Sequence, residues 1–268
     1  MSSISNKSLY EMKNIIAEIA DKAAKVIMQN INSPIEIKAD NTPVTKADKE
    51  SDKIINKELL NAFPNIPILS EERIPPQNNF GNNLHWIIDP LDGTKSFIEG
   101  DKDFCVCIAL ALNTRPILGC IAHPPSGTTW AGGSNISSYK KQNNMNFTKI
   151  SCRDIPLEGP TISISKHHIG PKLEKWLSSI NYFKKENVGS AIKFTLIAEG
   201  KADIFPRTSP TYEWDSAAGE AIIQGSGGFV TQMNNKNMIY GREDKKNPNF
   251  IAFGRSNWIK FIKENSSG

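Results

Sequence analysis

The sequence lacks the features of a membrane or secreted protein. Its longest hydrophobic run, Phe104 to Leu112, falls far short of the roughly 20 residues that a transmembrane helix needs. The polar residues 1–13 contain no export signal. Only four of 268 residues are cysteine; Cys105 and Cys107 lie two apart on one face of a predicted strand and cannot easily form a disulfide, and the four histidines do not lie near a pair of the spacing that a zinc site needs. We therefore expect free thiols and a cytoplasmic protein with no integral membrane segment; peripheral attachment to an inner membrane is left open.

A strong charge bias is also lacking. There are 32 basic and 28 acidic residues, a net charge of +4, and only 6 of the basic residues are arginine. Such a mild excess gives no reason to expect binding to nucleic acid, and the lysine pairs at 184–185 and 245–246 are isolated. We expect a small-molecule partner. The choice between a monomer and a homodimer is left open.

Hydrophobic spacing predicts helices first and a mixed pattern later. Apolar residues recur with helical period over Leu9–Gln29 and over Lys46–Ala62, which Thr45 would cap. Short apolar runs then predict antiparallel strands, including a hairpin between Phe104 and His123. The second half alternates strands with short helices, among them Asp215–Gln224 and a terminal helix over Ser256–Asn265.

This pattern predicts an α/β chain in two parts. Residues 1–135 would form an N-terminal α+β subdomain, and residues 136–268 a C-terminal α/β subdomain. The boundary is expected in Ser134–Asn146, a loop-like stretch rich in serine, asparagine and lysine.

Four acidic motifs follow or begin predicted elements, so their side chains could point to one site. Alone, each is also explained as an ordinary turn, helix cap or solvated charge. The motifs are Asp48 in Pro43–Asp48, the pair Glu71-Glu72, the segment Asp89-Pro90-Leu91-Asp92-Gly93-Thr94, and Asp215 in Glu213–Gly219.

The third motif is the most specific. A strand would deliver Asp89, Pro90 would turn the chain, and Asp92 would return three residues later near the Leu91 carbonyl. Mg²⁺ prefers such oxygen ligands. Gly93 would let the backbone approach a ligand, and the helix start that follows suits a phosphate. The combination indicates metal-assisted phosphoryl chemistry.

Together the motifs resemble the inositol monophosphatase superfamily of Mg²⁺-dependent, lithium-sensitive phosphomonoesterases, from about Lys38 to Phe253. Three further segments are similar to its 3'(2'),5'-bisphosphate nucleotidase branch, the CysQ type: Gly189–Phe194, Ala198–Asp203 and Pro206–Asp215. Ile164–His168 occupies the place of that branch's serine-arginine-serine-histidine run but departs from it at Lys166 and His167.

The resemblance implies a layered αβαβα sandwich with the site between the subdomains. It implies that Glu71, Asp89 and the Leu91 carbonyl bind one Mg²⁺, and that Asp89, Asp92 and Asp215 bind a second. A third, weaker ion would lie near Glu71. The implied catalytic residues are Asp48, Thr94 and Glu71, with Thr94 and Asp48 activating a water molecule.

The implied activity is hydrolysis of the 3'-phosphate of 3'-phosphoadenosine 5'-phosphate, in sulfur metabolism. Alternatives are an inositol-1-monophosphatase, a sugar bisphosphatase, and a non-catalytic Mg²⁺- or nucleotide-binding protein on the same fold. The expected substrate-binding residues are Gly93, Thr94, Ser165, Lys166, His168, Ser190, Lys193, Arg207 and Asp215.

Overall fold

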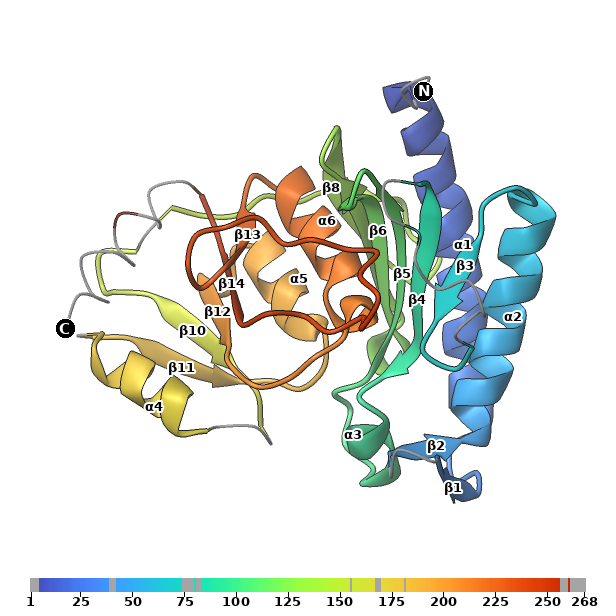
Figure 1. Ribbon diagram of the computed structural model, residues 1–268, viewed down its shortest axis with the longest axis horizontal. Coiled ribbons are helices and arrows are strands. Elements are labelled where there is room, and N and C mark those ends of the chain that lie inside the picture. Colours follow the sequence, from blue (N-terminus) through green and yellow to red (C-terminus); the bar gives the residue numbers. More distant parts are fainter. Residues whose placement is uncertain are drawn as a thin grey trace.

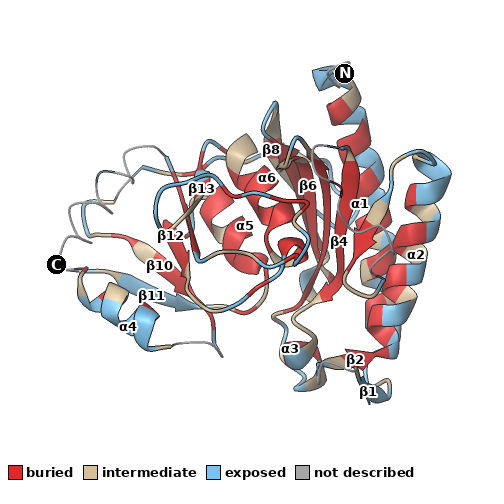
Figure 2. Cartoon of the chain, in the orientation of Figure 1, coloured by how far each residue is buried: buried red, intermediate tan, exposed pale blue. Residues whose placement is uncertain are grey.

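The computed structural model describes residues 5–38, 42–73, 80, 83–154, 156–166, 170–180, 182–255 and 260. Five layers follow one another: two long helices, a seven-stranded sheet, two short helices, a five-stranded sheet and one further helix (Figure 1). Buried residues concentrate in the large sheet and in the two short helices between the sheets (Figure 2). The layered αβαβα arrangement expected from the sequence is confirmed.

The two predicted N-terminal helices are present as α1 (Asn6–Gln29), which begins three residues before the predicted Leu9, and α2 (Lys46–Ala62), and they form one outer layer. One face of α1 is buried against the large sheet, because its apolar residues recur every three or four positions. The Thr45 hydroxyl caps α2 by accepting the N–H of Ala47 at 3.1 Å. No helix among the described residues has the length and apolarity to span a bilayer. The cytoplasmic location and any peripheral membrane attachment stay predictions.

Helix layers cover both faces of the seven-stranded sheet, so its central strands are almost wholly buried. The pair β3–β4 is parallel, and every other neighbouring pair is antiparallel. In sheet order the strands are β3 (Ile68–Ser70), β4 (His85–Asp92), β5 (Cys105–Leu112), β6 (Arg115–His123), β7 (Thr128–Gly133), β8 (Ile136–Gln142) and β9 (Thr148–Lys149).

Helices α5 (Ile192–Ala198) and α6 (Ala217–Gly225) fill the space between the two sheets. Strand β6 can approach α6 closely because Gly119 has no side chain. A Cβ at this position would lie only 2.3 Å from the Ala218 carbonyl oxygen. The helix predicted from Asp215 is shorter than expected. A 3₁₀ turn, η2 (Glu213–Asp215), precedes it.

The five-stranded sheet mixes both pairings. Strand β10 is parallel to β11 and β12, whereas β14 is antiparallel to β12 and β13. Helix α4 (Pro171–Ser178) belongs to the outermost layer. In sheet order the strands are β11 (Lys184–Asn187), β10 (Thr161–Ile164), β12 (Ile204–Arg207), β14 (Phe250–Phe253) and β13 (Phe229–Gln232).

The remaining elements are short: the hairpin of β1 (Ile35–Ile37) and β2 (Pro43–Thr45), the helix α3 (Thr94–Ile98) and the 3₁₀ turn η1 (Pro124–Ser126).

The prediction of a loop over Ser134–Asn146 is wrong, because this stretch contains β8. Its polar residues suit a strand that is only partly buried beside β7. The change of sheet therefore falls later, between Lys149 and Thr161. The subdomain division after residue 135 stays a prediction. The predicted helix Ser256–Asn265 lies outside the described residues except for Lys260.

Candidate active site

Three aspartates meet beside the inner face of the seven-stranded sheet. Asp89 lies in β4, Asp92 ends that strand, and Asp215 ends η2. One carboxylate oxygen of each lies within 4.8 Å of the other two. Burial and the neighbouring carboxylates raise the pKa of Asp89 well above its ordinary value and that of Asp215 to about 8. A bound cation would relieve this repulsion.

An irregularity in β4 sets the positions of its two aspartates, Asp89 and Asp92. The pairing of β4 with β5 is irregular between Asp89 and Asp92, where Pro90 removes a backbone donor. The N–H of Leu91 donates to Asp89 Oδ1 at 3.0 Å, and the Ser51 hydroxyl of α2 donates to the Pro90 carbonyl at 2.7 Å. The structure thus has an irregularity within β4 where the sequence predicted a turn after a strand.

Gly93 comes next and has a conformation that favours glycine. Its φ is +94°, and a Cβ there would lie 2.5 Å from the Asp103 carbonyl oxygen. Thr94 then begins α3, as predicted. Gly93 therefore lets the chain pass from the aspartates into a helix within one residue.

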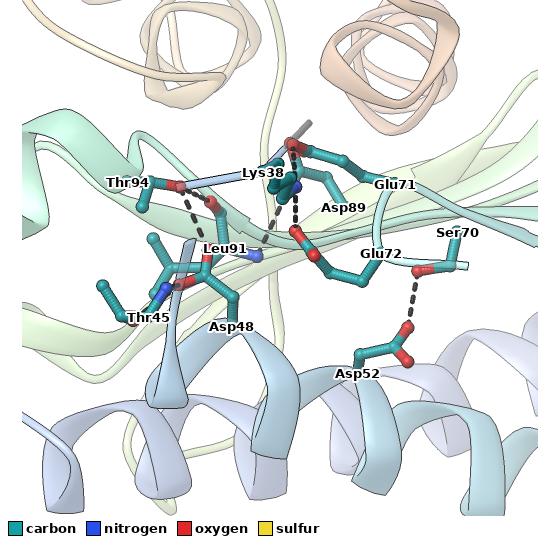
Figure 3. A network of polar contacts seen from close by, with 10 residues as sticks. All are labelled: Lys38, Thr45, Asp48, Asp52, Ser70, Glu71, Glu72, Asp89, Leu91 and Thr94. Carbon is teal, nitrogen blue, oxygen red and sulfur yellow. Dashed lines mark hydrogen bonds and ion pairs between the residues drawn. The ribbon is translucent and has the colours of Figure 1, made fainter. Parts of the chain in front are cut away.

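Thr94 and Asp48 form a second polar group beside β4 (Figure 3). Thr94 Oγ1 lies 3.0 Å from Asp48 Oδ1 and 3.2 Å from the Leu91 carbonyl oxygen. Asp48 Oδ2 accepts the N–H of Thr45 at 2.7 Å and its hydroxyl at 2.6 Å. Burial raises the pKa of Asp48, although these hydrogen bonds oppose the shift. The N-terminal cap of α2 therefore holds Asp48 with one oxygen directed at Thr94.

Glu71 follows β3 and pairs with Lys38 (Figure 3). Lys38 Nζ lies 3.0 Å from Glu71 Oε1 and 2.5 Å from Glu72 Oε1. Burial raises the pKa of Glu71 to about 7, against the attraction of Lys38. Glu71 in turn raises the pKa of Asp89. The acidic site therefore extends from Asp89 to Glu71. Lys38 was not identified from the sequence as part of this site, because the only indication was its position shortly before the Pro43–Asp48 motif.

A cavity of about 150 Å³ lies beside the aspartates. Seven of the predicted metal-binding and substrate-binding residues line it: Asp92, Gly93, Ser165, Ser190, Lys193, Arg207 and Asp215.

Two cations, the buried Lys193 and the half-buried Arg207, line this cavity in different ways. Lys193 donates to the carbonyl oxygens of Val188 at 3.1 Å and Ser190 at 2.5 Å, and burial lowers its pKa to about 8. Arg207 Nη2 lies 3.4 Å from the Pro210 carbonyl oxygen, and its buried Nε has no hydrogen-bond partner among the described residues. Lys193 therefore also supports the neighbouring loop, whereas Arg207 has donor capacity left for a ligand.

Two further predicted substrate residues, Thr94 and Lys166, do not line the cavity. Lys166 Nζ lies 2.8 Å from Asp101 and 2.6 Å from Asp103, which also accepts the N–H of Gly189 at 2.7 Å. His168 lies outside the described residues. Sequence reasoning missed Asp103, because an acid in a polar loop gives no signal of a partner so distant in sequence.

The family model described as the inositol monophosphatase family matches residues 8–256. The chain belongs to the inositol monophosphatase family. Enzymes of this family depend on Mg²⁺, and the three aspartates supply oxygen ligands of the kind that Mg²⁺ prefers.

Relatives of this family member include proteins named 3'(2'),5'-bisphosphate nucleotidase CysQ. That of Escherichia coli strain K12 is 34% identical over 246 residues, which cover 89% of this chain and 98% of the relative. That of Buchnera aphidicola is 36% identical over 235 residues, covering 86% and 88%. The crystal structure of CysQ from Bacteroides thetaiotaomicron superposes with a TM-score of 0.78 at 32% identity, covering 90% and 97%.

Proposed function

We propose that this chain is a Mg²⁺-dependent 3'(2'),5'-bisphosphate nucleotidase that hydrolyses the 3'-phosphate of 3'-phosphoadenosine 5'-phosphate. The observation that carries the proposal is the cavity, because two of the clustered aspartates and two basic side chains, Lys193 and Arg207, line one space. One phosphate can lie at the acidic cluster with its metal ions, while a second meets Lys193 and Arg207. The similarity to CysQ proteins over most of the chain supports the same activity.

The carboxylates fit a divalent cation, because they lie close together around the buried Asp89 and raise one another's pKa. We assign one Mg²⁺ to Glu71, Asp89 and the Leu91 carbonyl, and a second to Asp89, Asp92 and Asp215. A third, weaker ion near Glu71 is part of the proposal. When bound, Mg²⁺ acidifies a water molecule and neutralises the charge of the phosphoryl oxygens.

Thr94 and Asp48 would orient the attacking water. The Thr94 hydroxyl donates to Asp48 and can accept a hydrogen bond from water. As the water attacks phosphorus, its proton passes to the Thr94 oxygen while the Thr94 proton passes to Asp48. The raised pKa of Asp48 suits this acceptor role. The backbone N–H groups of Gly93 and Thr94 would hold the phosphoryl oxygens, and Glu71 stays a predicted catalytic residue.

The second phosphate and the nucleoside would select the substrate. A bisphosphate carries one more charged group than an inositol monophosphate, so cations are needed at a distance from the metal ions. Lys193 and Arg207 supply them, with the Ser165 and Ser190 hydroxyls nearby in the same lining. Contacts of Lys166 and His168 with the substrate stay predictions.

The test is phosphate release from 3'-phosphoadenosine 5'-phosphate and from inositol 1-phosphate, with Mg²⁺ and with EDTA. The variants are Asp89→Asn and, as a matched control outside the cluster, Asp244→Asn. We expect strong preference for the nucleotide, lost with EDTA and in Asp89→Asn but retained in Asp244→Asn. Preference for inositol 1-phosphate would overturn the substrate. No release from either would favour a binding protein without catalysis.

A further inference from the structure

Two buried thiols lie beside the aspartate cluster. Cys105 and Cys107 alternate along β5, so both side chains leave the same face of the sheet. In the antiparallel ladder Cys105 pairs with Asp92 and Cys107 pairs with Asp89. Each thiol therefore lies across the ladder from an aspartate of the proposed Mg²⁺ site.

The distances among these atoms match those within the shell of a tetrahedral metal ion. The two Sγ atoms are 3.8 Å apart, and Cys105 Sγ lies 3.8 Å from Asp92 Oδ2. All three ligand atoms lie within 4.8 Å of one another. With Zn–S bonds of about 2.3 Å, two sulfur ligands of tetrahedral Zn²⁺ are about 3.8 Å apart. The thiols thus need little movement to bind one ion.

The cavity offers a route to this site. Asp92 and Ser190 both line it, and Ser190 Oγ lies 3.6 Å from Cys105 Sγ. An ion that enters the cavity therefore meets the thiols behind Ser190, and water or the Ser190 hydroxyl can complete four ligands. The other two cysteines are elsewhere: Cys120 packs in the core between the sheet and α1, and Cys152 contacts Ser226.

We propose that Cys105, Cys107 and Asp92 form an inhibitory site for a thiophilic divalent cation such as Zn²⁺ or Cd²⁺. Sulfur ligands select these ions over Mg²⁺, which binds oxygen. The inhibition rests on the proposed function, because Asp92 is the carboxylate that the two sites share. When the ion binds, both thiols release their protons to water, and Asp92 is withdrawn from the catalytic Mg²⁺.

The first experiment titrates Cd²⁺ into the reduced protein in Mg²⁺ buffer and follows the ultraviolet sulfur-to-cadmium charge-transfer absorption. This readout needs no activity. We expect saturation at one ion per chain, loss of the absorption in Cys105→Ser/Cys107→Ser, and its retention in the matched control Cys120→Ala/Cys152→Ala. Absence of the absorption in the native chain, or its persistence in Cys105→Ser/Cys107→Ser, would overturn the site. Should that double variant fail to fold, Cys105→Ser alone keeps a donor toward Asp92 and should still lose most of the absorption.

The second experiment measures inhibition of phosphate release by Cd²⁺ and by Zn²⁺ at fixed Mg²⁺. Loss of a group that merely supports a metal ligand lowers metal affinity by about 10- to 100-fold. Loss of both thiols should therefore raise the half-inhibiting concentration at least about tenfold. Equal inhibition of the native and Cys105→Ser/Cys107→Ser chains would overturn the proposal, since the ion would then act at the carboxylates alone. Full activity at cadmium saturation would overturn the withdrawal of Asp92. A native chain inactive on both substrates would refute the proposed function, while the absorption titration would still decide the site.

Discussion

Replacing Arg207 with methionine tests how the cavity selects its substrate. Arg207 is half-buried in the cavity wall, its buried Nε lacks a partner among the described residues, and the bond from Nη2 to the Pro210 carbonyl is long at 3.4 Å. A guanidinium has five N–H donors in a planar fork that suits a phosphate. Arg207 is therefore more available to a ligand than Lys193, which already donates to two carbonyl oxygens.

The size of the effect follows from these contacts. A hydrogen bond to a charged group contributes about 1.5–3 kcal/mol, and each 1.4 kcal/mol is about tenfold in affinity. We therefore expect Arg207→Met to raise KM for 3'-phosphoadenosine 5'-phosphate by about 10- to 100-fold. KM for adenosine 3'-phosphate, which lacks the second phosphate, should rise less than about threefold. The unfolding free energy should change by no more than about 1 kcal/mol, because one long hydrogen bond is lost.

The assay is steady-state phosphate release from both substrates, with urea unfolding in Mg²⁺ to compare stabilities. Arg242→Met is the matched control, since Arg242 does not line the cavity. An equal rise in KM for both nucleotides would refute the reasoning. Arg207 would then act on the aspartates, whose pKa values it lowers through its charge, and not on the second phosphate.

Three further predictions concern separate layers of the molecule. Thr94→Ala should lower kcat by about 10²- to 10⁴-fold with little change in KM, because Asp48 loses the hydroxyl that it orients; steady-state kinetics within about threefold of native would contradict this. Gly119→Ala should destabilise by about 1–3 kcal/mol in urea unfolding, because its Cβ would meet the Ala218 carbonyl at 2.3 Å; an unchanged midpoint would contradict the close contact. Burial lowers the pKa of Lys13 from 10.5 to about 8, so the unfolded chain binds the extra proton between these values and stability should rise with pH there. Lys13→Met should remove up to about 3 kcal/mol of this rise, measured by unfolding at pH 8 and pH 10.5; parallel pH curves would contradict it.

The sequence predicts some elements better than others for a physical reason. Helices α1 and α2 were predictable because an apolar stripe of period 3.6 and the Thr45 cap lie within one segment. Strand β8 was not, because Ser-Ser-Tyr-Lys-Lys has little apolar character of its own. It becomes a strand by pairing with β7 and β9, and such partners are invisible in a local window.

The site residues, too, were predictable only where residues close in sequence determine the arrangement. The proximity of Asp89 and Asp92 could be predicted because a few residues of one strand bring them together. Asp215 could be placed with them only through the family resemblance. The pairing of Lys166 with Asp101 and Asp103 depends on the contact between two distant loops, which no local pattern specifies.

Apart from Asp215, which joins the aspartates of the N-terminal half, the two halves of the chain make separable contributions to the proposed reaction. Residues before position 135 supply Asp48, Glu71, Asp89 and Thr94, which lie on or beside the seven-stranded sheet and would act on the phosphate that is removed. Loss of such a group should lower kcat, because its role is confined to the reacting phosphoryl group. Arg207 ends β12 of the other sheet and would meet the phosphate that stays on the product. Loss of that contact weakens substrate and transition state alike, so it should raise KM and leave kcat unchanged. A change mainly in KM from a variant of Asp48 or Thr94, or mainly in kcat from a variant of Arg207, would show that the two halves do not divide the reaction in this way.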